Sequence, residues 1–141
     1  MGRWLNYFRK NNSDAVQGNL LGPTETTDIV IDNTDPSQRL AYERLHNLIK
    51  QSGGQKRTHA IVNAEALRIL LGEEPDQLYE ALGVPKSKRE RLPTSAQEAL
   101  MAGNIAAFYV IVEDNAQGHD QIIRSSKQGF HRAKGIFPWN R

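Results

Sequence analysis

The sequence contains no cysteine, which excludes disulfide bonds, thiolate metal ligands and a cysteine nucleophile. It also lacks a long apolar run, because the longest one, residues 105–112, falls far short of the roughly 18 residues that cross a bilayer. No apolar stretch follows the basic start of the chain, so no secretory signal is predicted. These absences predict a cytoplasmic protein without a membrane span.

Catalytic and metal-binding motifs are missing as well. There is no GxSxG elbow, and residues 53–56 (Gly-Gly-Gln-Lys) lack the fixed glycine spacing of a phosphate-binding loop. No two histidines have the helical spacing of metal ligands, so we interpret all four as surface or helix-cap residues. They are His46, His59, His119 and His131. The sequence therefore predicts a protein that is not an enzyme and that holds no cofactor or metal.

Charge is distributed unevenly along the chain, although the formal net charge is only +2. Residues 1–10 are basic without any acid, residues 11–38 are acidic without any base, and residues 116–141 are mainly basic. Basic ends of this kind indicate a polyanionic partner. An acidic stretch that shields a basic end within the same molecule produces the same pattern.

Composition divides the chain near residue 35. Residues 11–35 are rich in Asn, Gly, Thr and Asp and cannot bury enough apolar surface to offset the entropy of ordering. We therefore expect residues 1–35 to form a flexible tail, with a short amphipathic start and an acidic linker, and residues 36–141 to form one helical domain. At the start, RWLNYFRK places Trp4, Leu5 and Phe8 on one helical face, where they are candidates for docking on a partner protein.

Cap signals and apolar spacing predict four to five short helices, so the expected fold is an all-α orthogonal bundle. Pro36 and Pro75 mark helix starts, and Gly83 marks a helix end before a proline. Thr94 and Gln97 have the spacing of a capping box ahead of a long helix.

Other boundaries depend on weaker signals. Asn63 is expected to cap a helix that ends at Leu71, and a last helix is expected over residues 118–134. The composition of residues 108–112 favours a strand, whereas the uninterrupted apolar spacing favours a helix, which we prefer. The apolar tail at residues 136–139 is expected to pack back on the domain.

Two basic segments are candidates for binding nucleic-acid phosphates, provided that their loops converge. Their residues are Lys56, Arg57, Lys86, Lys88, Arg89 and Arg91. Solvated loops of no particular function carry similar charge, so both interpretations stay open. Residues 78–91 also invite a helix-turn-helix interpretation, but Tyr79 stands where a small residue is needed and Arg89 where an apolar one is needed.

Residues 58–107 resemble a small helical module of phage antirepressor (Bro-type) and DNA-damage-inducible proteins. The matching pieces are Asn63, Leu71-Gly72, Leu82-Gly83-Val84, residues 89–91, Leu92 and Thr94. The chain departs from the module in lacking its Arg-Asp-His connector and the aromatic residue before Gly72. The resemblance implies a regulatory, DNA-associated role in phage or mobile-element biology, and it implies no catalytic residues.

These observations support two hypotheses. The first is a non-enzymatic regulatory or interaction protein that binds a polyanion, such as DNA, through its cationic loops. The alternative is a protein-binding adaptor or assembly component that docks on a larger complex through RWLNYFRK. The sequence leaves the oligomeric state open.

Overall fold

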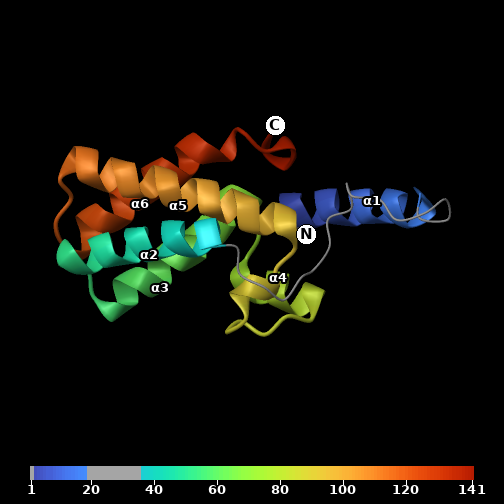
Figure 1. Cartoon of the computed structure of the whole chain (residues 1–141), viewed down its shortest axis with the longest axis horizontal. Coiled ribbons are helices and arrows are strands. Elements are labelled where there is room, and N and C mark those ends of the chain that lie inside the picture. Colours follow the sequence, from blue (N-terminus) through green and yellow to red (C-terminus); the bar gives the residue numbers. More distant parts are fainter. Residues whose placement is uncertain (1, 19–35) are drawn as a thin grey trace.

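The computed structural model describes residues 2–18 and 36–141, and every regular element in these ranges is helical (Figure 1). The expectation of an all-α fold is therefore confirmed. Residues 36–141 contain five α-helices, which agrees with the four to five expected there, and α1 is a sixth; one π-helical turn and two 3-10 turns accompany them in the described ranges. In chain order the elements are α1 (Arg3–Gly18), α2 (Pro36–Gln51), α3 (Lys56–Ala66), the π-turn η2 (Leu67–Leu71), α4 (Pro75–Leu82), the 3-10 turn η3 (Arg89–Arg91), α5 (Thr94–Asp114), α6 (Gly118–Lys134) and the 3-10 turn η4 (Pro138–Asn140).

The long helix α5 is the central element of the bundle, and α2, α6 and η2 pack against it (Figure 1). Glycine lets α5 and α6 approach closely, because a Cβ atom on Gly129 would lie 2.5 Å from the Cα of Ala107. Residues 108–112 lie inside α5, so the preference for a helix over a strand is confirmed. The last helix has the predicted bounds, residues 118–134.

One helix in the described part of the chain, α5, is long and apolar enough to cross a membrane by length and composition. Its most apolar window has a mean hydropathy of 1.2, and half of that window is buried inside the bundle. This burial is what the central helix of a packed bundle requires.

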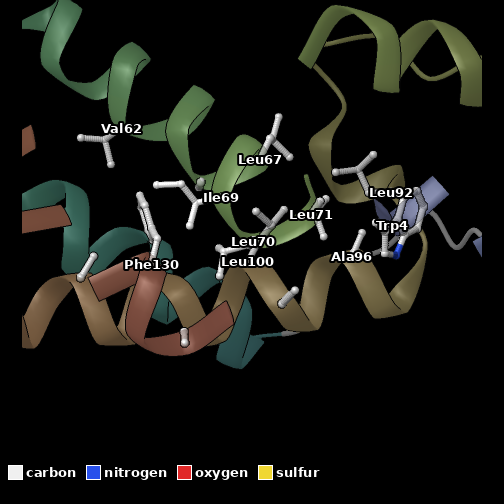
Figure 2. Packing of buried hydrophobic residues seen from close by; sticks show 14 of the residues in the cluster. Trp4, Val62, Leu67, Ile69, Leu70, Leu71, Leu92, Ala96, Leu100 and Phe130 are labelled. Carbon is white, nitrogen blue, oxygen red and sulfur yellow. The ribbon is translucent and has the colours of Figure 1, made fainter. Parts of the chain in front are cut away.

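The helix that was expected to begin at Asn63 begins at Lys56 instead. The backbone N–H of Gln55 donates to Thr58 Oγ1 over 2.9 Å, which fixes the first turn well before Asn63. At its other end α3 continues directly into η2, whose wider turn allows Leu70 and Leu71 to be buried together (Figure 2). Gly72 then ends the helix with φ 70°, as the sequence predicts.

The first residues of the chain belong to the core, and this corrects the expectation of a free tail and of a docking peptide. Trp4, Leu5 and Phe8 are 0%, 2% and 9% exposed, and all three belong to the main apolar cluster. The Trp4 indole N–H donates to Ser95 Oγ over 2.9 Å, and the ring lies beside the start of α5 (Figure 2). A short helix is only marginally stable alone in water, so the burial of these apolar side chains against the bundle stabilises α1. The acidic linker was expected over residues 11–35, but residues 11–18 continue α1, and residues 19–35 lie outside the described residues.

A buried carboxylate caps α1 from a distant part of the chain. Glu73 is 3% exposed and accepts the backbone N–H groups of Gly2 over 3.1 Å and Leu5 over 2.7 Å. These groups have no partner within a helix, so the carboxylate satisfies donors that would otherwise be buried unpaired. Burial raises the pKa of Glu73, and the two N–H groups act in the opposite direction.

The C-terminal residues pack back on the bundle as expected. The Trp139 indole N–H donates to the carbonyl of Leu70 over 2.7 Å, which satisfies a group at the end of the π-turn. Phe137 stacks on Trp139, and Tyr7 of α1 contacts the same indole. Ile136 is the exception, since it remains 61% exposed.

Candidate functional site

The six basic candidates do not form one patch. Lys56 and Arg57 are exposed at the start of α3, near the turn between α5 and α6, because Thr58 hydrogen-bonds His119 over 2.7 Å. Residues 86–91 follow α4 at the opposite end of the bundle (Figure 1). The two segments therefore do not converge, and the condition for a shared phosphate-binding patch is not met. The reason is that α3 and η2 span the length of the bundle between them.

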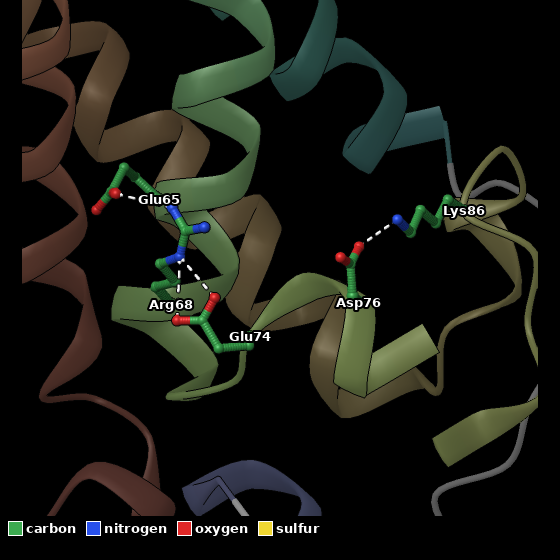
Figure 3. A network of polar contacts seen from close by, with 5 residues as sticks. All are labelled: Glu65, Arg68, Glu74, Asp76 and Lys86. Atoms are coloured by element: carbon green, nitrogen blue, oxygen red, sulfur yellow. Dashed lines mark hydrogen bonds and ion pairs between the residues drawn. The ribbon is translucent and has the colours of Figure 1, made fainter. Parts of the chain in front are cut away.

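The four basic residues of the second segment differ in their surroundings. Lys86 is exposed and forms an ion pair with Asp76, beside the separate Glu65–Arg68–Glu74 network (Figure 3). Lys88 is also exposed, whereas Arg91 is half-buried. Exposed pairs of this kind contribute little to stability and leave the lysine accessible.

Arg89 is the unusual member of the set, because its guanidinium group is buried. The residue as a whole is half-buried, but its Nη2 atom is inaccessible to solvent and has no hydrogen-bond partner among the described residues. Burial lowers the pKa of Arg89, and the nearby Tyr79 and Tyr42 act in the opposite direction. An arginine still keeps its charge near neutral pH. A buried cation without an anion is costly, so this position calls for an explanation.

Local hydrogen bonds fix the segment that carries Arg89. Gln97 donates through Nε2 to the carbonyls of Glu90 and Leu92 over 2.7 and 2.6 Å. The capping box expected from Thr94 and Gln97 is therefore wrong, because the glutamine side chain holds η3 instead of the helix start. Gln97 is 8% exposed, so the two hydrogen bonds that it donates to this segment are shielded from water.

Arg89 lines a pocket of about 650 Å³ that lies between α2, α3, α4, η3 and α5. Its volume falls in the range of small-molecule sites, roughly 300–1,000 Å³. Two more cations, Arg39 and Lys86, lie at the same pocket. Glu90 is the one acidic residue among those that line it. The pocket therefore carries an excess of positive charge.

A row of polar side chains connects the pocket wall to a pair of histidines. His46 Nδ1 lies 2.7 Å from His59 Nδ1, His46 Nε2 lies 3.1 Å from Asn63 Oδ1, and Asn63 Nδ2 lies 3.4 Å from the Tyr42 hydroxyl. The Tyr42 and His46 rings are in contact, with centroids 4.1 Å apart. His46 and His59 are thus not isolated surface residues, because the packing of α2 against α3 brings them together.

Charge near this pair opposes a further proton. The pKa of His46 is lowered to about 4, chiefly by burial and also by the neighbouring His59 and Arg89. The same charge would oppose a metal cation. Within the described ranges, no three His, Cys, Asp or Glu residues come together in an arrangement that could hold a metal ion.

Sequence reasoning named Lys86 and Arg89 as cations of a phosphate-binding patch without predicting a pocket, and it did not include Tyr42, Asn63 or the histidine pair among the site residues. The resemblance pointed to residues 89–91 without distinguishing the buried arginine from its neighbours. No model of a known protein family matches this chain, and no curated protein matches it.

Proposed function

We propose that this chain is a non-catalytic binding protein that recognises an oxyanion at the pocket containing Arg89. The observation that carries the proposal is the buried Nη2 atom, which has no partner among the described residues. A carboxylate, sulfate or phosphate oxygen would supply the hydrogen-bond acceptor and the opposite charge together. Such a ligand would convert an unfavourable burial into a favourable pair.

The regulatory, DNA-associated role implied by the resemblance is a version of the same proposal, in which the oxyanion is a nucleic-acid phosphate. Lys86 and Lys88 are exposed beside the pocket and suit backbone contacts. Lys56 and Arg57 lie too far away to join them (Figure 1). DNA binding through this end of the bundle therefore depends on residues 86–91 alone.

NMR spectroscopy of the full chain tests the proposal with inorganic sulfate and with a short DNA duplex and its single strand. We expect sulfate to shift the Arg89 side-chain signals and the backbone amides of residues 89–91. Arg89→Gln should abolish these shifts, whereas Arg57→Gln, which removes an exposed cation at the distant end, should leave them unchanged. Shifts that persist in Arg89→Gln, or an absence of shifts with every oxyanion, would overturn the proposal.

A further inference from the structure

The pocket also indicates what kind of molecule carries the oxyanion, an inference that rests on the proposed function. We infer that the ligand is a small organic anion with a flat apolar body, whose oxyanion lies at Arg89 and whose body lies against the apolar wall of the pocket. Size, lining, hydrogen-bond polarity and the position of the other cations all bear on this inference.

The pocket is much larger than an oxyanion. Its volume of about 650 Å³ equals that of roughly 20 water molecules at about 30 Å³ each. A free sulfate or phosphate ion would fill only a small part of that space. The remaining volume must hold either water or the rest of a larger ligand.

The lining favours a ligand with an apolar body. Apolar atoms supply most of the pocket surface, although many lining residues are polar. Apolar side chains contribute from three elements: Ala64 from α3, Leu67 from η2, and Leu100 and Met101 from α5. Aromatic rings contribute as well, since Tyr79 is 7% exposed and Tyr42 is 38% exposed. Contact between water and such a wall is unfavourable. A flat ring would instead contact the thioether of Met101 and the rings of Tyr42 and Tyr79.

The polar row described above gives the pocket a second donor. If Asn63 Nδ2 donates to the Tyr42 oxygen, Asn63 Oδ1 accepts from His46 Nε2, and His59 Nδ1 then donates to His46 Nδ1. These proton positions follow from pairing each donor with an acceptor. The Tyr42 hydroxyl oxygen accepts in this series of hydrogen bonds, so the hydroxyl proton can be donated to a ligand oxygen.

The other cations do not suit a duplex as the main ligand. Binding to duplex phosphates needs several accessible cations along a surface. Among residues 86–91 only Lys86 and Lys88 are exposed cations, and the buried Arg89 cannot reach a phosphate that stays on the surface of a duplex. A small molecule can enter the pocket and reach it.

Calorimetry of the full chain with three matched probes tests the inference. Naphthalene-1-sulfonate carries both features, 1-naphthalenemethanol carries only the ring, and inorganic sulfate carries only the oxyanion. We expect naphthalene-1-sulfonate to bind at least tenfold more tightly than either of the other two. Arg89→Gln should reduce its affinity to that of the neutral ring.

A second variant fills the apolar part and leaves Arg89 in place. Ala64→Phe should weaken naphthalene-1-sulfonate at least tenfold while sulfate still shifts the Arg89 signals. The matched control is Ala81→Phe on the exposed side of α4, outside the pocket, and it should leave the affinity for naphthalene-1-sulfonate unchanged.

Each other outcome is decisive. Equal affinity for sulfate and naphthalene-1-sulfonate, both lost in Arg89→Gln, would overturn the apolar-body inference and keep the oxyanion site. Equal affinity for the neutral ring and the sulfonate, unchanged in Arg89→Gln, would overturn the proposed function itself, as would no binding of any probe. A single-stranded oligonucleotide that binds more than tenfold tighter than the sulfonate and displaces it would assign the pocket to nucleic acid.

Discussion

Two buried charges, Glu73 and Arg89, are treated in opposite ways by the same fold. Glu73 receives two backbone N–H groups from the start of α1, so the chain itself satisfies its charge. Arg89 lies at a pocket, and its Nη2 atom has no partner among the described residues. The comparison teaches that burial alone does not indicate function. A buried charge with partners from its own chain stabilises the fold, whereas one without them is a candidate binding group.

The largest effect should come from the anchor that brings α1 to Glu73. Trp4→Ala removes an indole that is 0% exposed, together with its hydrogen bond to Ser95. We expect a loss of about 3–5 kcal/mol in the free energy of unfolding, measured by urea denaturation. Asn6→Ala, on the exposed side of the same helix, should change it by less than about 0.5 kcal/mol. A similar small change in Trp4→Ala would mean that α1 does not belong to the core.

The next largest effect should come from Glu73 itself. Glu73→Ala leaves the N–H groups of Gly2 and Leu5 without their acceptor, and hydrogen bonds to charged groups contribute about 1.5–3 kcal/mol each. We expect the free energy of unfolding to fall by about 2–4 kcal/mol, because water can replace the carboxylate as acceptor for part of the lost hydrogen bonding.

The neighbouring residue provides a control for this variant. Glu74 is exposed and pairs with Arg68 at the surface, so Glu74→Ala should cost no more than about 0.5 kcal/mol. Faster amide hydrogen exchange in residues 3–8 of Glu73→Ala would locate the loss at α1. Equal stability of the two variants would show that the buried carboxylate contributes nothing as a cap.

Several helix ends could be predicted from the sequence, whereas the long-range contacts that place α1 could not. Local signals predicted the bounds of α4, the left-handed glycines Gly72 and Gly83 and the last helix, because each depends on residues within one or two turns. The docking of Trp4 on α5 depends on residues 91 positions apart, and no local pattern encodes it.

The same limit applied to the candidate site. Arg89 was named as an exposed cation of a basic loop, although it also stood where a helix-turn-helix would bury an apolar residue. The residue is half-buried and its Nη2 atom is inaccessible to solvent, so the two patterns conflicted and the charge was given too much weight. His46 and His59 are 13 residues apart on different helices, and only the packing of α2 against α3 brings them together.

Lowering the pH provides a further test, because a proton on His46 would add positive charge near the buried Arg89. The pKa of His46 is lowered from 6.5 to about 4 in the fold, so the unfolded chain binds a proton between these values that the folded chain does not. Stability is therefore present above pH 6.5 and is lost as the pH falls towards 4. We expect a loss of about 2 kcal/mol over this window, allowing for the partial exposure of the ring.

Urea denaturation of the wild type and of His46→Asn at several pH values measures this contribution. The difference between the two proteins separates His46 from Glu73, whose raised pKa acts in the opposite direction as the pH falls. The loss between pH 6.5 and 4 should shrink most in His46→Asn and less in His131→Asn, because burial lowers the pKa of His131 as well but that ring on α6 is more exposed. An identical pH dependence in wild type and His46→Asn would exclude this role for the histidine.

The smallest change in stability, and the one of opposite sign, should come from Arg89. Arg89→Met replaces a buried cation, whose Nη2 atom has no hydrogen-bond partner among the described residues, with an apolar chain of similar length. The unfolding free energy should therefore rise by about 1 kcal/mol instead of falling. Arg124→Met, at an exposed position on α6, should leave it unchanged. Saturating naphthalene-1-sulfonate should then reverse the order, because it stabilises the wild type and not Arg89→Met. A loss of stability in ligand-free Arg89→Met would mean that the chain already satisfies this charge, and the contrast with Glu73 would disappear.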